Sequence, residues 1–343
     1  MISTTYGFGK HLGVLGGMGR GLLLLLASLA MAPATTFGQQ PETPQTPTFK
    51  SGVDLVTVTA TVRDKRGRLV RGLAKADFEV LDSGQKRTIT EFRDDPSPVS
   101  LAILFDISGS MRVADRMTAA RFAARHVLSW LENGRDEAAL LTFDSRLHEV
   151  APFTVDTRAL QGALGEVDPF GATSLHDAIA EAAKRVATRT GRRRAVVVIT
   201  DGIDTSSALT PGEVSGIASA IDVPVYVIAT VLPIDHPGRE GSARPEPEAI
   251  EIDGSVANLA TWTGGASYYA STPADTSHAA RQVLDELRQQ YVLAFEPALA
   301  SGWRPLEIRT RDKDYVVRAR SGYMAGGPRG RVDGGGTVVR PVF

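Results

Sequence analysis

Apolar and polar positions alternate with a period of two in the first part of the chain, and the rhythm changes near residue 98. Between 56 and 62, valine or alanine occupies every second position with threonine between, which predicts a strand with one buried face. Further short strands are expected at 78–81 and 88–92. The polar, proline-containing stretch 94–98 interrupts this pattern and indicates a domain boundary.

Beyond this boundary, apolar runs of strand length alternate with segments of helical periodicity. The runs 99–105 and 195–200 are apolar throughout, as in strands buried on both faces, whereas 114–131 repeats its apolar residues at helical spacing. This alternation predicts an α/β fold: a doubly wound, mainly parallel sheet with helices on both faces. Strand pairs without helices return at 306–310 and 315–320.

These changes of rhythm divide the chain into six segments. We expect a signal peptide, a Pro-rich linker, a β-rich flanking segment, the α/β domain, C-terminal strands and a glycine-rich disordered tail, over 1–38, 39–50, 51–95, 98–296, 297–323 and 324–343. The C-terminal strands are expected to pair with the β-rich flanking segment. The two together would form a smaller β-domain beside the α/β domain.

The first 38 residues have the pattern of an export signal. Lys10, His11 and Arg20 precede or flank the start of an apolar run over 21–32, which is too short for a membrane helix but suits a signal core. We therefore expect an extracytoplasmic protein, periplasmic or secreted, with no stable membrane insertion after signal cleavage. The alternative is an uncleaved signal that tethers the protein to the membrane.

Composition narrows the classes of function further. The formal net charge of −1 argues against a dedicated nucleic-acid binder, which would carry a basic excess. The chain has no cysteine, so disulfides and a lipid-modified N-terminal cysteine are excluded. We interpret the run Arg192–Arg194 as the solvated end of a loop, with a phosphate or partner contact as the alternative.

The candidate chemistry begins directly after the apolar run 99–105. Asp106, Ser108 and Ser110 alternate along a short segment that contains a glycine, so one carboxylate and two hydroxyls can direct their oxygens at one point. Hard oxygen ligands of this kind suit Mg²⁺, Mn²⁺ or Ca²⁺ rather than zinc or copper.

Two further loops are expected at the same edge of the sheet. In an open parallel sheet, ligands bind beyond the carboxyl ends of the strands, where the strand order reverses. Asp201 follows the strand 195–200 at that edge, and Thr173 lies in the loop that enters a long helix. The three loops offer two carboxylates and three hydroxyls, and two carboxylates balance the charge of a divalent cation.

These five residues, their order and the strands around them resemble the von Willebrand factor type A (integrin I-like) domain family over about residues 98–296. The resemblance implies a Rossmann-like fold and a complete metal-ion-dependent adhesion site. It also implies that Ser108, Ser110 and Thr173 bind the cation directly, that Asp106 or Asp201 acts through water, and that a partner's Glu or Asp fills an open position. The flanking strands are similar to those of exported bacterial members of the family.

We therefore expect a protein without enzymatic activity that binds a protein partner through a cation, Mg²⁺ first, with Mn²⁺ or Ca²⁺ possible. The partner would offer an acidic side chain, and no nucleic acid would bind. One alternative is a structural module of the cell envelope that a metal stabilises. The other is a Mg²⁺-dependent hydrolase, which would need a base beside the ion.

Four polar residues near the expected site have simpler interpretations. His176 is the one base within reach, and we expect it to pack rather than to catalyse. Asp177 is expected to cap the helix that follows Ser174, as in a capping box. Indirect or surface roles are expected for Asp144 and Asp204.

Overall fold

The computed structural model describes residues 55–113, 115–163, 169–189, 193–230 and 254–326. The expected signal peptide and Pro-rich linker lie outside the described residues. No helix among the described residues is long and apolar enough to cross a membrane.

A six-stranded sheet forms the centre of the α/β part, in the order β10-β9-β8-β5-β6-β7. All neighbouring strands are parallel except β7, which pairs antiparallel with β6. The predicted mainly parallel sheet is thus confirmed, and its strand order reverses between β5 and β8. The strands are β5 (Val99–Asp106), β6 (Glu137–Phe143), β7 (Leu147–Thr154), β8 (Arg193–Thr200), β9 (Val225–Thr230) and β10 (Ser267–Ala270).

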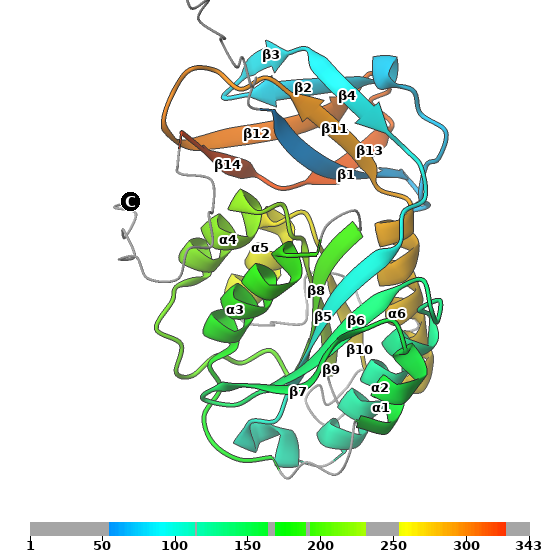
Figure 1. Cartoon of the computed structure of the whole chain (residues 1–343), viewed down its shortest axis with the longest axis vertical. Helices are drawn as coiled ribbons and strands as arrows, with labels where there is room; N and C mark the ends of the chain where they lie inside the picture. The colour runs from blue at the N-terminus through cyan, green and yellow to red at the C-terminus, as the bar shows by residue number, and fades with distance from the viewer. Residues whose placement is uncertain (1–54, 114, 164–168, 190–192, 231–253, 327–343) are drawn as a thin grey trace, which may run out of the picture. The chain divides into compact units, whose positions relative to one another are not determined.

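Helices cover both faces of this sheet, as predicted (Figure 1). Successive side chains of a strand point to opposite faces, so Leu101 and Ile103 pack on one side and Ala102 and Leu104 on the other. This explains why the run 99–105 is apolar throughout. One face carries α1 (Arg116–Ser129), α2 (Thr157–Ala163) and α6 (Pro273–Arg288), and the other carries α3 (Leu175–Ala187), α4 (Pro211–Ala220) and α5 (Gly254–Trp262).

Local sequence determines where α6 begins. The Thr272 hydroxyl accepts a hydrogen bond from Asp275 N at 3.2 Å, and the Asp275 carboxylate accepts one from Thr272 N at 3.0 Å. Pro273 occupies the first turn, where its missing N–H costs no hydrogen bond. This reciprocal cap satisfies backbone donors that have no partner inside the helix.

Two four-stranded antiparallel sheets flank the α/β part, in the orders β13-β1-β11-β4 and β14-β12-β2-β3. Strands from both ends of the described chain pair in them, β1 with β13 and β2 with β12. One apolar cluster contains side chains from both sheets, among them Val58, Phe78 and Ile308. The strands are β1 (Val56–Asp64), β2 (Phe78–Asp82), β3 (Gln85–Arg87), β4 (Ile89–Arg93), β11 (Tyr291–Phe295), β12 (Gly302–Thr310), β13 (Tyr315–Ala319) and β14 (Gly322–Ala325).

Two details differ from the expected segments. We placed the strand at 291–295 within the α/β domain, but β11 pairs with β1 and β4 instead. All five of its residues are buried, so its apolar run gives no indication of which sheet it joins. The disordered tail was expected from 324, yet β14 continues to Ala325, because Tyr323 and Ala325 are buried in the cluster of the antiparallel sheets.

A buried acid connects α6 to the antiparallel sheets. Glu286 of α6 is fully buried, and its carboxylate accepts hydrogen bonds from Arg63 of β1 and Arg318 of β13. The Tyr268 hydroxyl of β10 donates to the same carboxylate at 2.9 Å. A carboxylate that is excluded from water is tolerated only when such partners surround it.

Replacement of this acid should destabilise the protein strongly. We expect Glu286→Ala to lower the free energy of unfolding by about 3 to 5 kcal/mol, because it leaves two partly buried guanidinium groups without their anion. Urea unfolding followed by circular dichroism measures the change. Glu307→Gln, which breaks an exposed pair with Arg309, is the control and should cost at most about 1 kcal/mol. Equal effects of the two substitutions would contradict this role of Glu286.

Candidate metal site

The candidate site lies at the carboxyl ends of β5 and β8, where the strand order reverses. Asp106 is the last residue of β5, and Asp201 directly follows Thr200, the last residue of β8. The two strands are parallel neighbours, so both acids lie at the same edge of the sheet. Such edges are where open α/β sheets bind ligands.

Asp106 is fully buried and is held by two hydrogen bonds. One carboxylate oxygen accepts from Ser108 N at 2.8 Å, and the other accepts from the Thr200 hydroxyl at 2.6 Å. Burial raises the pKa of the Asp106 carboxyl to about 6, and the Asp201 carboxylate raises it as well, although these hydrogen bonds lower it. The negative charge of Asp106 is therefore costly here, and a nearby cation would relieve that cost.

The two serines of the motif bring their hydroxyls together. A short 3₁₀ turn, η2 (Gly109–Arg112), follows Ser108 and folds the chain back on itself. As a result, Ser108 Oγ and Ser110 Oγ lie 3.1 Å apart. Ser108 is fully buried, so its oxygen faces the interior of the loop rather than bulk water.

Asp201 has one paired and one unpaired oxygen. Its Oδ2 accepts a hydrogen bond from Arg116 Nη1 of α1 at 3.1 Å. Its Oδ1 is buried and has no hydrogen-bond partner among the described residues. A buried carboxylate oxygen without a donor is costly, and a bound cation would satisfy it.

The loop of Thr173 is fixed between the other two loops by backbone hydrogen bonds. Gly109 N donates to Gly171 O at 2.9 Å, and Thr173 O accepts from Thr205 N, also at 2.9 Å. Thr173 is buried, and its own N–H donates to the Thr205 hydroxyl at 2.8 Å. These contacts hold Thr173 at the same edge of the sheet. Its role as a metal ligand stays a prediction.

Glycine is required where the first and third loops touch. A Cβ at Gly109 would lie 3.2 Å from the Gly171 carbonyl oxygen, closer than ordinary contact. Gly171 itself has a φ of +89°, a left-handed conformation that other residues adopt only with strain. A side chain at Gly109 would therefore press against the third loop, and one at Gly171 would strain the backbone of that loop.

The donor set fits a hard divalent cation. Two carboxylates and the adjacent hydroxyls of Ser108 and Ser110 supply only oxygen, the ligand type of Mg²⁺, Mn²⁺ and Ca²⁺. Across the described ranges, no group of three or more His, Cys, Asp or Glu side chains is arranged to hold a metal. Any cation at this site would therefore depend on hydroxyl oxygens as much as on carboxylates.

The capping box expected at the start of α3 is wrong. The Ser174 side chain makes no capping hydrogen bond, and the Asp177 carboxylate accepts from Ala208 N and Leu209 N, both at 2.9 Å. The carboxylate at the start of α3 is instead that of Asp204, which accepts from Leu175 N at 2.8 Å. The sequence spacing favoured Asp177, which is close to Ser174 along the chain. The fold instead places Asp204, from the loop after β8, at the start of the helix.

His176 is buried beside Asp204 but activates no hydroxyl. Its Nδ1 lies 3.5 Å from Asp204 Oδ2, and its Nε2 has no hydrogen-bond partner among the described residues. The nearby Ser207 hydroxyl donates to Asp204 at 2.6 Å rather than to the imidazole. A serine nucleophile would need its hydroxyl bonded to the histidine, so this arrangement does not resemble a hydrolytic triad.

Two residues at the site were not found from the sequence. Thr200 directly precedes Asp201, so a polar residue at the end of an otherwise apolar strand was an available signal. Arg116 gives no such signal, because any exposed helix carries arginines. Only the position of α1 relative to β8 brings this guanidinium to Asp201.

Comparison with known proteins supports the fold. Residues 101–203 match the family model of the von Willebrand factor type A domain. No curated protein sequence matches the chain. The mostly parallel sheet with helices on both faces is the fold of such domains, here flanked by additional antiparallel sheets.

Three solved structures illustrate the likeness. An aerotolerance-related membrane protein from Bacteroides fragilis NCTC 9343, carrying multiple mutations to serine, is 23% identical over 55% of this chain and 98% of its own, with a TM-score of 0.44. A von Willebrand factor type A protein from Catenulispora acidiphila is 14% identical over 80% of this chain and 73% of its own, with a TM-score of 0.44. Proximal thread matrix protein 1 from the mussel byssus, with a zinc-occupied MIDAS motif, is 15% identical over 60% of this chain and 49% of its own, with a TM-score of 0.45. The segment that matches the von Willebrand factor type A domain, 101–203, contains all five candidate ligands.

Proposed function

We propose that this protein binds a protein partner through a divalent cation held by Asp106, Ser108, Ser110, Thr173 and Asp201. The observation that carries the proposal is the buried, unpaired Oδ1 of Asp201 at the same edge as the buried Asp106 carboxylate. Two acids held this way repel each other, and a divalent cation between them would satisfy both. When bound, the cation supplies positive charge that an acidic side chain of the partner can approach. Mg²⁺ is the first candidate, with Mn²⁺ and Ca²⁺ as alternatives.

Exposed apolar side chains beside the site indicate what surrounds the partner's acid. Phe170 is 73% exposed, Ile203 51% and Val113 48%. Phe170 is tied to the first loop by a hydrogen bond from its N–H to Ile107 O at 2.9 Å, and Ile203 lies two residues after Asp201. Large apolar residues next to a charged site are typical of protein-binding surfaces. We infer a partner segment with an acidic residue flanked by apolar ones.

Export belongs to the proposal as well. The signal pattern over 1–38 would direct the site to the outside of the cytoplasm, where the partner would be an envelope, surface or secreted protein. The absence of cysteine removes any dependence on disulfide formation there.

Metal binding should raise the melting temperature. We expect Mg²⁺ or Mn²⁺ added to metal-free protein to stabilise the fold by about 2.7 kcal/mol at a concentration 100 times the Kd, with reversal by chelator. Differential scanning fluorimetry measures the shift. Asp201→Ala should abolish it, whereas Asp285→Ala, on the surface of α6, should leave it unchanged. A shift that survives in Asp201→Ala would place the metal elsewhere.

Loss of the Asp106 carboxylate should affect stability differently with and without metal. In chelator, Asp106→Asn should raise the free energy of unfolding by about 1 to 3 kcal/mol, because burial, which raises the pKa of this carboxyl, makes its charged form costly and the substitution removes that charge. Addition of Mg²⁺ should not stabilise the variant further, because the variant lacks one of the proposed metal ligands. Urea unfolding in both buffers separates the two effects. If Asp106→Asn instead lowers the free energy of unfolding in chelator, burial of the Asp106 charge is not costly and the prediction is wrong.

Partner binding tests the function itself. We expect the immobilised full chain to retain an extracytoplasmic partner in Mg²⁺ but not in chelator. Phe170→Ala should weaken the retention about tenfold while the metal-dependent melting shift is kept. Leu299→Ala, at an even more exposed apolar residue distant in sequence, is the control and should have no effect. Retention that is indifferent to chelator would favour the structural-module alternative.

A further inference from the structure

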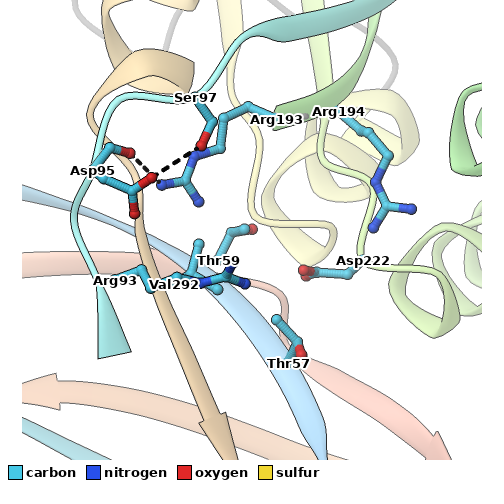
Figure 2. A pocket seen from close by; sticks show the side chains of 9 residues that line it. All are labelled: Thr57, Thr59, Arg93, Asp95, Ser97, Arg193, Arg194, Asp222 and Val292. Carbon is cyan, nitrogen blue, oxygen red and sulfur yellow. Dashed lines mark hydrogen bonds between the residues drawn. The ribbon is translucent and has the colours of Figure 1, made fainter. Parts of the chain in front are cut away.

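A second candidate site lies at the opposite end of β8, where the strand begins. A cavity of about 210 Å³ is lined there by residues of the central sheet and of the antiparallel sheet of β1, β4 and β11. Figure 2 shows Arg193 and Arg194 extending from β8, and Arg93 and Thr59 from the antiparallel strands, toward this cavity. The cavity is polar and rich in guanidinium groups, unlike the candidate metal site.

The basic run was interpreted above as a solvated loop end, and for two of its residues this is wrong. Arg193 is only 5% exposed, and Arg194 is half-buried. Arg192 lies outside the described residues. The antiparallel sheet covers the position at which β8 begins, which the sequence around the run does not indicate. The burial of these two arginines favours the alternative interpretation, a contact with phosphate.

Arg193 is a buried cation with unused hydrogen-bonding capacity. Its Nη2 donates to Asp95 O at 3.1 Å, but its Nε is buried and has no partner among the described residues. Burial lowers the pKa of Arg193, Asp95 opposes this change, and the charge of Arg93 adds to it. The carboxylates of Asp95 and Asp222 lie near this guanidinium, yet its Nε stays without a hydrogen-bond partner among the described residues.

The charges around the cavity do not balance. Three arginines and two aspartates line it, and Arg320 lies next to it with Nε 3.6 Å from Asp222. Arg194 binds the carbonyl oxygens of Ala187 at 2.9 Å and Ile221 at 3.4 Å, which are uncharged. Among the lining residues, three guanidinium groups therefore face two carboxylates, an excess of one positive charge.

We propose that this cavity binds a small oxyanion of the phosphate type, either free or as the phosphoryl end of a larger molecule. Guanidinium groups bind phosphate oxygens with paired, charge-assisted hydrogen bonds, and the hydroxyls of Thr57, Thr59 and Ser97 add donors. The volume lies below the range of about 300 to 1,000 Å³ that holds drug-sized ligands, so a small group fits and a nucleotide does not. An oxyanion would offset the excess positive charge.

The site is independent of the proposed cation site. The two lie at opposite ends of β8, and one is acidic where the other is basic. Oxyanion binding in the presence of chelator would therefore report on this cavity alone. The proposal can fail or hold whatever the outcome for the cation.

The test is a phosphate titration of the full chain in chelator, at neutral pH and at ionic strength matched with NaCl. We expect a saturable rise in melting temperature. Arg93→Gln, an exposed residue at the cavity, should raise the half-saturating concentration about tenfold. Arg125→Gln, exposed on α1, is the matched control and should leave it unchanged. Arg193→Met, where it folds, should abolish saturation.

Two further arms complete the test. Titration with inorganic phosphate and with glycerol 3-phosphate shows which form of phosphate binds. Equal half-saturating concentrations indicate that the cavity accepts the phosphoryl end of a larger molecule, and binding of inorganic phosphate alone indicates the free ion. A rise that does not saturate, or that is the same in Arg93→Gln and Arg125→Gln, would reflect the general stabilising effect of phosphate salts and would overturn the proposal.

Discussion

The burial of Glu286 is the constraint on which the arrangement of the described residues depends. Its carboxylate is excluded from water and reaches its partners Arg63, Arg318 and Tyr268 only when α6 and β10 lie against β1 and β13. Without them the charge would be too costly to bury. The central sheet and the antiparallel sheets are thereby coupled, and the described residues belong to one compact unit.

The central strands separate two regions of opposite charge. β8 begins at Arg193, beside a cavity with excess positive charge, and is followed by Asp201, beside a second buried carboxylate. Between them the strand is buried and apolar, so neither region neutralises the other directly. The two proposed sites therefore differ in the ion that they would bind, a cation at the carboxyl end and an anion at the amino end.

The chemistry at the carboxyl end favours binding over catalysis. The hydrogen bonds of Asp106, Ser108 and Asp201 hold the loops in place. Among the described residues, Asp201 Oδ1 has no donor. The His176 imidazole contacts Asp204, and its Nε2 has no hydrogen-bond partner in the part of the chain that the structure describes. An arrangement of this kind can hold an ion, but it supplies no activated nucleophile.

Local sequence patterns predict the parallel α/β sheet and the loops at its edge. The alternation of apolar strands with helices and the spacing of Asp106, Ser108 and Ser110 are local patterns, which a single chain segment displays. Tertiary structure alone decided that β11 joins the antiparallel sheet and that Arg193 is buried, and it alone brought Arg116 to Asp201. An apolar strand or an arginine is compatible with several neighbours. Which neighbour it meets depends on packing between segments far apart in the chain, and no local pattern encodes that.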